Sequence, residues 1–188
     1  MKNNILLFIG LMLARTAFPQ SNPDIKIIPQ PQSIHVFKGS LVLKEPVAII
    51  ADDDLMDRAI QIRRYLEPPT GFIISMNPDN AAGSIIELKL CNELEYLGEE
   101  GYKLEVTEEK VNVTAFHSNG IFWGIQSLRQ LLPKEIMREA KVKDIQWVIP
   151  CLSIEDKPRF RWRGLMIDYS RTFWNKRHTK RIIYVLAW

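Results

Sequence analysis

Hydrophobic residues recur along this chain with two different periods, and each period predicts its own kind of element. Residues 101–107 and 111–116 alternate apolar and polar positions one by one, with Glu108, Glu109 and Lys110 between them. A period of two places one set of side chains on one face of a strand. The two runs are therefore expected to form a hairpin that is buried on one side. Shorter apolar or extended runs predict further strands at residues 25–28, 47–50, 72–76, 85–90 and 147–154.

A second hairpin is expected near the start of the chain. Apolar residues at 34–37 and 41–43 flank Lys38, Gly39 and Ser40. A short polar segment that contains glycine between two apolar runs is typical of a hairpin turn.

The first helix is expected from Leu55, Ala59, Ile62 and Leu66, which fall on one face at helical spacing. Three aspartates at residues 52–54 precede it, and their charge suits the positive end of a helix dipole. The prolines at residues 68–69 are expected to end this helix. A metal site at the three aspartates is possible on chemical grounds, but a helix start explains them more simply.

A second helix is expected at residues 119–132, capped by Ser118 and ended by Pro133. Its apolar stripe consists of Ile121, Ile125, Leu128 and Leu132. Gly120 and Gly124 lie four residues apart on one face. Each costs a helix about 1 kcal/mol relative to alanine. A close approach to a sheet would account for both.

These elements predict an α+β fold for residues 21–153, with an antiparallel-rich sheet and two helices packed on one face. Residues 137–143 read as a polar, irregular connection. The chain has 188 residues and a formal net charge of +3. That charge is too small and too local to indicate nucleic-acid binding.

The cysteines and histidines are few and scattered. Cys91 and Cys151 could form a disulfide in an exported protein, although two separate buried thiols are favoured because the two lie far apart and neither sits in a metal-type spacing. The three histidines form no metal-ligand spacing, so no metal or cofactor is expected.

The N-terminus resembles an export signal. A lysine at position 2 is followed by ten apolar residues at 5–14. Ten helical residues rise only about 15 Å, which is half the hydrocarbon thickness of a membrane. Residues 1–20 are therefore expected to be a signal peptide rather than a membrane span. Ala14 and Ala17 are candidate cleavage sites, and a buried N-terminal helix is the alternative.

The most distinctive stretch is residues 157–173, KPRFRWRGLMIDYSRTF. Aromatic and arginine residues lead into a short apolar run at 165–167 that ends at Asp168. This pattern predicts a strand whose polar end faces a site, and the basic amphipathic residues 175–188 predict a helix after it.

Three ordered motifs together resemble family 20 glycoside hydrolases, the β-N-acetylhexosaminidases. They are IIPQPQSI at residues 27–34, GYKLEV at 101–106 with NGIFWGIQSLRQLLP at 119–133, and IEDKPRFRWRGLMIDYSRTF at 154–173. The resemblance implies a small α+β domain up to residue 153. It also implies that residues 154–188 begin a (β/α)8 catalytic barrel, which needs roughly 250 residues in all.

The resemblance also implies a chemistry. Such enzymes remove terminal N-acetylglucosamine or N-acetylgalactosamine, and the substrate's own acetamido oxygen attacks the anomeric carbon. Arg163 matches the family arginine that binds sugar hydroxyls. Asp168 matches an acidic residue with a supporting role, and Arg171 matches a structural arginine. The catalytic Asp–Glu pair would lie beyond residue 188, so this chain alone is expected to be inactive.

Some alternatives stay open from the residues. Arg163 could be an arginine paired with an acid for stability, and strict alternation would put Arg163 and Asp168 on opposite strand faces. Trp162 and Trp174 could stack on sugar, although core positions are favoured. The chain could instead be a free-standing carbohydrate- or partner-binding module. It could also be part of another glycosidase family with a similar first domain, such as an α-glucuronidase or an O-GlcNAc hydrolase.

Overall fold

The structure is a computed structural model that describes residues 25–80 and 82–187. The signal peptide expected at residues 1–20 lies outside the described residues. None of the helices in the described ranges is long and apolar enough to cross a bilayer.

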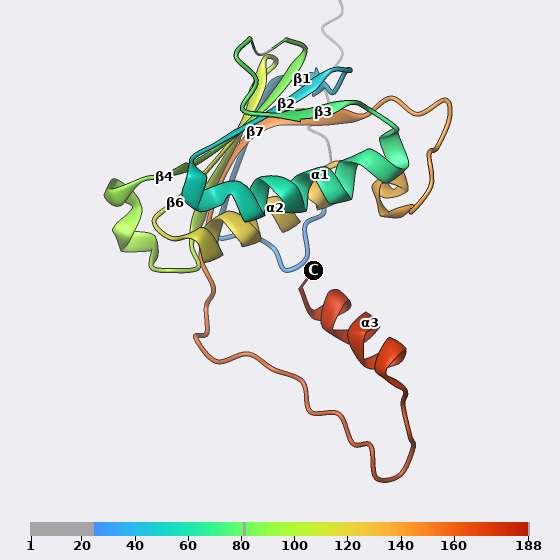
Figure 1. Ribbon diagram of the computed structural model, residues 1–188. Coiled ribbons are helices and arrows are strands. Elements are labelled where there is room, and N and C mark those ends of the chain that lie inside the picture. Colours follow the sequence, from blue (N-terminus) through green and yellow to red (C-terminus); the bar gives the residue numbers. More distant parts are fainter. Residues whose placement is uncertain (1–24, 81, 188) are drawn as a thin grey trace, which may run out of the picture.

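A seven-stranded sheet forms the centre of the described structure, in the order β1-β7-β5-β6-β4-β2-β3 (Figure 1). The strands are β1 Ser33–Val42, β2 Val47–Ala51, β3 Ile74–Met76, β4 Ser84–Leu90, β5 Tyr102–Val106, β6 Lys110–Ala115 and β7 Val148–Asp156. The hairpin expected near residues 101–116 is confirmed as the antiparallel pair β5–β6. Residues 25–28, expected as a strand, form none.

The sheet is mixed, so the expected antiparallel-rich pairing holds on only one side of it. Pairs β1–β7, β5–β7 and β5–β6 are antiparallel. Pairs β4–β6, β2–β4 and β2–β3 are parallel. The first helix lies between β2 and β3 in the chain, and such a crossover is what a parallel pair requires.

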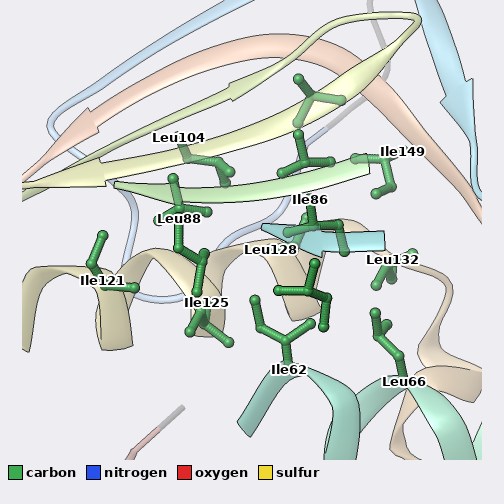
Figure 2. Packing of buried hydrophobic residues seen from close by; sticks show 14 of the residues in the cluster. Ile62, Leu66, Ile86, Leu88, Leu104, Ile121, Ile125, Leu128, Leu132 and Ile149 are labelled. Atoms are coloured by element: carbon green, nitrogen blue, oxygen red, sulfur yellow. The ribbon is translucent and has the colours of Figure 1, made fainter. Parts of the chain in front are cut away.

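Both main helices cover the same face of the sheet and lie side by side (Figure 1). They are α1, Met56–Thr70, and α2, Ser118–Leu131. All eight stripe residues expected from the periodicity are buried: Leu55, Ala59, Ile62, Leu66, Ile121, Ile125, Leu128 and Leu132. Figure 2 shows Ile62 and Leu66 of α1 packed with residues of α2 and of the sheet. The α+β layering is therefore confirmed.

The two glycines of α2 face the sheet at close range, as their cost in a helix suggested. A Cβ at Gly120 would meet the Gly101 carbonyl group and lie 2.7 Å from the Cβ of Ala115. A Cβ at Gly124 would lie 2.5 Å from Cγ1 of Val113. The helix can approach strands β5 and β6 this closely only because both positions lack a side chain.

Helix ends differ from expectation by one or two residues. Helix α1 continues through Pro68 and Pro69 and ends at Thr70, where Gly71 takes a left-handed conformation with φ of 66°. Each proline lacks the N–H that would bond to the carbonyl four residues back, and the helix ends one residue after Pro69 rather than before Pro68. Helix α2 is capped by the ring of His117, which accepts a hydrogen bond from the Asn119 N–H, rather than by Ser118.

The hairpin expected around Lys38, Gly39 and Ser40 is wrong. Residues 33–42 form the single strand β1, and the register shifts between Val36 and Ser40. Both halves pair with β7 because that strand is long enough to bond each in turn. The turn-like residues therefore mark a bulge, which local sequence does not distinguish from a hairpin.

Residues 157–175 form neither helix nor strand, so the barrel strand expected at 165–167 is absent from the described structure. A strand needs a neighbour for its backbone hydrogen bonds, and no described strand runs beside this segment. The helix expected after it is present as α3, Lys176–Leu186, capped by Asn175. Trp162 is 93% exposed and Trp174 is 40% exposed, so neither lies in the core.

Three short 3-10 helices complete the described elements. They are η1 Asp53–Leu55, η2 Asn92–Leu97 and η3 Lys134–Met137. The aspartates at 53 and 54 lie in the first turn of η1, which leads directly into α1. The helix-start interpretation of these aspartates is confirmed.

Candidate functional site

A cavity in the described structure lies where residues 157–163 pass the sheet domain. Its volume is about 630 Å³. Residues of five regions line it: the 27–30 segment, the start of β5 with the residues just before it, helix α2, the end of β7 with the chain that follows it, and Leu186 of α3. Its polar lining includes Glu100, Asp156 and Arg163, and its aromatic lining includes Tyr102, Trp123 and Phe160. Aromatic surface beside a few convergent polar groups is typical of a small-molecule site.

Arg163 lies at this cavity and forms a two-pronged ion pair with Glu100. The Nη2 group lies 2.7 Å from Oε1 of Glu100, and Nη1 donates to Oε2 at 3.2 Å. The Nη1 group also donates to the backbone carbonyl of Phe160 at 2.6 Å. The side chain of Arg163 remains 38% exposed. The alternative interpretation of Arg163, an arginine paired with an acid, therefore has a direct structural basis.

Trp123 of helix α2 anchors the same cluster. Its indole N–H donates to Oε1 of Glu100 at 3.2 Å, and its ring centre lies 5.6 Å from the guanidinium carbon of Arg163. The hydrogen bond from Arg163 lowers the pKa of Glu100 below its usual range, and the indole N–H adds to this effect. Glu100 is therefore a carboxylate at neutral pH and a fixed partner for the arginine.

The inner side of the cavity holds polar groups that are themselves satisfied. The buried hydroxyl of Tyr102 shares a hydrogen bond with Ser127 of α2. Burial raises the pKa of Tyr102 and also that of Asp156. Asp156 accepts a hydrogen bond from the Gln32 N–H at 3.0 Å. These contacts fix the cavity's inner side to the sheet.

Asp168 is not brought to the cavity. Its Oδ1 accepts hydrogen bonds from the backbone N–H and the hydroxyl of Ser170, and Arg171 lies 3.8 Å from its Oδ2. The hydroxyl of Ser170 is the main cause that lowers the pKa of Asp168. Arg163 and Asp168 are thus separate here. The strand alternation argued for these two residues is not tested, because residues 163–168 form no strand. Arg171 contacts the carboxylate of Asp168.

Sequence reasoning identified Arg163 but did not identify its partners. The sequence patterns do not single out Glu100, and Trp123 occurs only within the motif at residues 119–133. Glu100 and Arg163 are 63 residues apart in the chain. Trp123 lies among polar residues of α2, next to the buried Gly124. That position is the one signal in the sequence that could have pointed to the cluster with Glu100 and Arg163.

The cysteines and the potential metal-ligating side chains of the described ranges lie apart from one another. No group of three or more metal-ligating side chains occurs among the described residues. Cys91 and Cys151 are both free thiols, and only Cys151 is fully buried. The favoured interpretation of separate thiols is confirmed, although Cys91 is partly exposed.

The described residues thus define an α+β sheet domain followed by an extended segment that presents an arginine beside an aromatic cavity. The chain belongs to glycosyl hydrolase family 20, because the model for "Glycosyl hydrolase family 20, domain 2" matches residues 24–157. The resemblance inferred from the three motifs is confirmed.

Characterised proteins of this family are similar over most of the chain. A β-N-acetylhexosaminidase of Cellulomonas fimi is 29% identical over 169 residues, which is 88% of this chain and 32% of that protein. The family 20 β-N-acetylhexosaminidase of Streptomyces coelicolor is 30% identical, with a TM-score of 0.75 over 83% of this chain and 31% of the other.

A third relative has been solved with a ligand. The N-acetyl-β-hexosaminidase of Streptomyces plicatus, in complex with thio-NAglucal, is 29% identical, with a TM-score of 0.76 over 87% of this chain and 32% of that one. The chain therefore spans about a third of the length of these relatives.

Proposed function

We propose that this chain is the N-terminal part of an exported β-N-acetylhexosaminidase. The enzyme would remove terminal non-reducing N-acetylglucosamine or N-acetylgalactosamine. The observation that carries the proposal is the family match over residues 24–157, continued by the WRG motif that contains Arg163.

Retention of configuration is proposed to rely on the substrate itself. The acetamido oxygen attacks the anomeric carbon and displaces the leaving group, which a glutamic acid protonates. Water then opens the intermediate. A neighbouring aspartate orients the acetamido group. The glutamic acid and the aspartate are proposed to lie beyond residue 188, and residues 1–188 alone are expected not to hydrolyse a glycoside.

Arg163 is proposed to bind hydroxyls of the terminal sugar. A guanidinium is planar, permanently charged and able to donate to two adjacent oxygens at once. Asp168 is proposed to support the site through a hydrogen bond, with a smaller effect than Arg163. No cofactor is proposed.

The experiment expresses this chain together with any coding sequence that follows the Trp188 codon. Hydrolysis is measured with a chromogenic β-N-acetylglucosaminide, a β-N-acetylgalactosaminide and a plain β-glucoside. We expect activity on the two acetamido sugars and little on the glucoside, because the glucoside lacks the attacking group.

Arg163→Ala supplies the residue-level control. Loss of hydrogen bonds from a charged donor costs about 1.5–3 kcal/mol, so kcat/KM is expected to fall roughly 10- to 150-fold. The proposed function is wrong if the glucoside is cleaved as well as the acetamido sugars. A hexosaminidase rate from the purified 188-residue chain would contradict its proposed inactivity.

Export is tested separately. Residues 1–20 are fused to a reporter enzyme that is active only outside the cytoplasm. Active reporter with residues 1–20, and none with a fusion that starts at residue 21, supports export. Equal signals from the two fusions would contradict it.

A further inference from the structure

Residues 27–32 run from helix α2 to the end of β7, just before β1 begins. Ile27 belongs to the buried core cluster, and Pro31 is also buried. Each end of this segment makes a two-point hydrogen-bonded contact with residues that are 102 to 125 positions away in the chain. The segment therefore joins two distant parts of the domain.

One end of the segment is fixed to helix α2 by a single glutamine. The Ile28 N–H donates to Oε1 of Gln130 at 2.9 Å, and Nε2 of Gln130 donates to the Ile28 carbonyl, also at 2.9 Å. The side-chain amide thus satisfies both backbone groups of one residue, as a neighbouring strand would. Two bonds to one residue fix its direction as well as its position.

The other end is fixed to the residues that leave the sheet. Backbone pairing of β1 with β7 ends at Ser33 and Glu155. One residue further along, the Gln32 N–H donates to Oδ1 of Asp156 at 3.0 Å, and Nε2 of Gln32 donates to the Lys157 carbonyl at 2.9 Å. Side chains therefore continue the contact between the two segments after the backbone ladder has ended.

Two prolines stiffen the chain between these contacts. Pro29 and Pro31 each hold their own φ at about −65° and restrict the residue before them to extended geometry. A short connection that is restricted in this way cannot absorb a displacement of one end by bending. A shift at Ile28 is therefore passed on to Gln32, and a shift at Gln32 to Ile28.

We infer that residues 27–32 act as a strap that couples helix α2 to the point where the chain leaves the sheet domain. The strap sets the position of residues 156–157 relative to α2, and with it the direction in which residues 157–163 leave the sheet. This role holds whether or not the proposed function is correct, because it depends only on contacts within the described residues.

Hydrogen exchange of the 188-residue chain, measured by mass spectrometry, tests the coupling. From residue 28 to residue 32, the prolines leave only the amides of Ile28, Gln30 and Gln32, so short peptides report each end separately. Gln130→Ala removes both bonds to Ile28. We expect exchange to rise roughly 3- to 10-fold at Ile28, which loses an acceptor, and at least about 3-fold at Gln32, whose own bonds are unaltered.

Gln32→Ala is the reciprocal change. It removes the bond to the Lys157 carbonyl, and exchange should rise at Ile28, on the far side of both prolines. Gln30→Ala is the matched control, because Gln30 lies in the same segment and is exposed. Exchange at Ile28 and Gln32 should be the same in this variant as in the wild-type chain.

Faster exchange at Ile28 alone in Gln130→Ala would show that the two contacts are independent, and it would overturn the strap. An equal rise throughout strand β5, at the centre of the sheet, would overturn it as well, because the whole domain would then have loosened. Equal rises in Gln30→Ala and Gln130→Ala would show that the hydrogen bonds of Gln130 are not the cause.

Trypsin supplies a second measurement on the same chains. Pro158 protects the bond after Lys157, so Arg159 is the first residue beyond the strap at which trypsin cleaves. Cleavage after Arg159 should be about 3-fold faster in Gln130→Ala than in the wild-type chain, and unchanged in Gln30→Ala. Equal cleavage rates in all three chains would contradict a strap that holds the exit from the sheet.

Discussion

Two tyrosines illustrate how burial decides the value of a hydrogen bond. Tyr102 is 2% exposed and shares its hydroxyl with Ser127 inside the domain. Tyr96 is 57% exposed and donates to Glu155 at the surface. A buried hydroxyl that loses its partner pays the full desolvation cost, whereas water replaces a lost partner at the surface.

We therefore predict that Tyr102→Phe lowers the free energy of unfolding by about 1–2 kcal/mol, because it leaves the hydroxyl of Ser127 without this partner. The matched variant Tyr96→Phe should change it by less than about 0.5 kcal/mol. Urea denaturation of both variants checks the prediction, and equal losses would contradict it.

The ion pair at Glu100 predicts a dependence of stability on pH. The pKa of Glu100 is lower in the folded chain than in the unfolded chain, chiefly because Arg163 donates to it. The stabilisation is therefore present above the unfolded pKa and is lost as the pH falls through the folded pKa. It is worth less than about 1 kcal/mol, since the pair is partly exposed.

The measurement is Tm between pH 7 and pH 3. Glu100→Gln should melt slightly below the wild-type chain at pH 7, and the difference should vanish toward pH 3. Glu99→Gln should follow the wild-type curve throughout. A difference between Glu100→Gln and wild type that stays constant across this range would show that the ion pair is not its source.

At the scale of single residues, the sequence predicted the arginine but not its environment. Arg163 stands in a motif specific enough to point to a role. Its partner Glu100 lies in a loop where acidic residues are common, and nothing local distinguishes Glu100 from Glu99. The difference between them arises from tertiary structure, which places Trp123 and Arg163 beside only one of the two.

At the scale of elements, helix α2 depends on the absence of two side chains. Alanine would favour the helix by about 1 kcal/mol at each glycine. At Gly120, however, an added Cβ would meet the backbone carbonyl of Gly101, which cannot move without the strand. The contact with β5 and β6 therefore outweighs the local preference.

We predict that Gly120→Ala destabilises the domain by about 1–3 kcal/mol despite its better helix propensity. Gly164→Ala is the control, since no atom lies within 4 Å of the position that its Cβ would take. Its effect should stay within about 0.5 kcal/mol. Thermal unfolding measures both, and a stabilised Gly120→Ala variant would refute the close approach.

Helices were predicted well from sequence, and strand pairing was not. The buried stripes of α1 and α2 follow directly from the spacing of their apolar residues. Which strands pair in the sheet depends on how the crossover connections bring distant strands together. A local sequence pattern can reveal only the pairing of two strands that are joined by a short turn. The parallel pairs of β2 with β3 and β4, and the two-part pairing of β1 with β7, were therefore not predictable from local patterns.

At the scale of the whole molecule, apolar side chains are divided between two regions. The buried cluster consists entirely of residues between Ile27 and Ile154. The chain beyond residue 157 contributes none to it. Several of its large apolar side chains are exposed instead: Phe160, Trp162, Met166, Phe173, Ile183, Tyr184 and Val185.

We predict that residues 25–157 fold on their own, with Tm within about 2 °C of residues 25–188, because both contain the same buried cluster. The longer chain should bind a hydrophobic dye and self-associate, as large exposed apolar patches do. Calorimetry, dye fluorescence and sedimentation check this. An unfolded shorter chain would contradict it.

The position of β7 in the sheet has a consequence for synthesis. Strand β1, near the start of the described chain, pairs only with β7, and β7 lies between β1 and β5. On the ribosome, residues 33–42 must therefore wait, unpaired, until residues 148–156 have emerged. Contacts so distant in sequence also slow folding. The domain can close only once residue 156 has left the ribosome, and Arg163 leaves it only seven residues later.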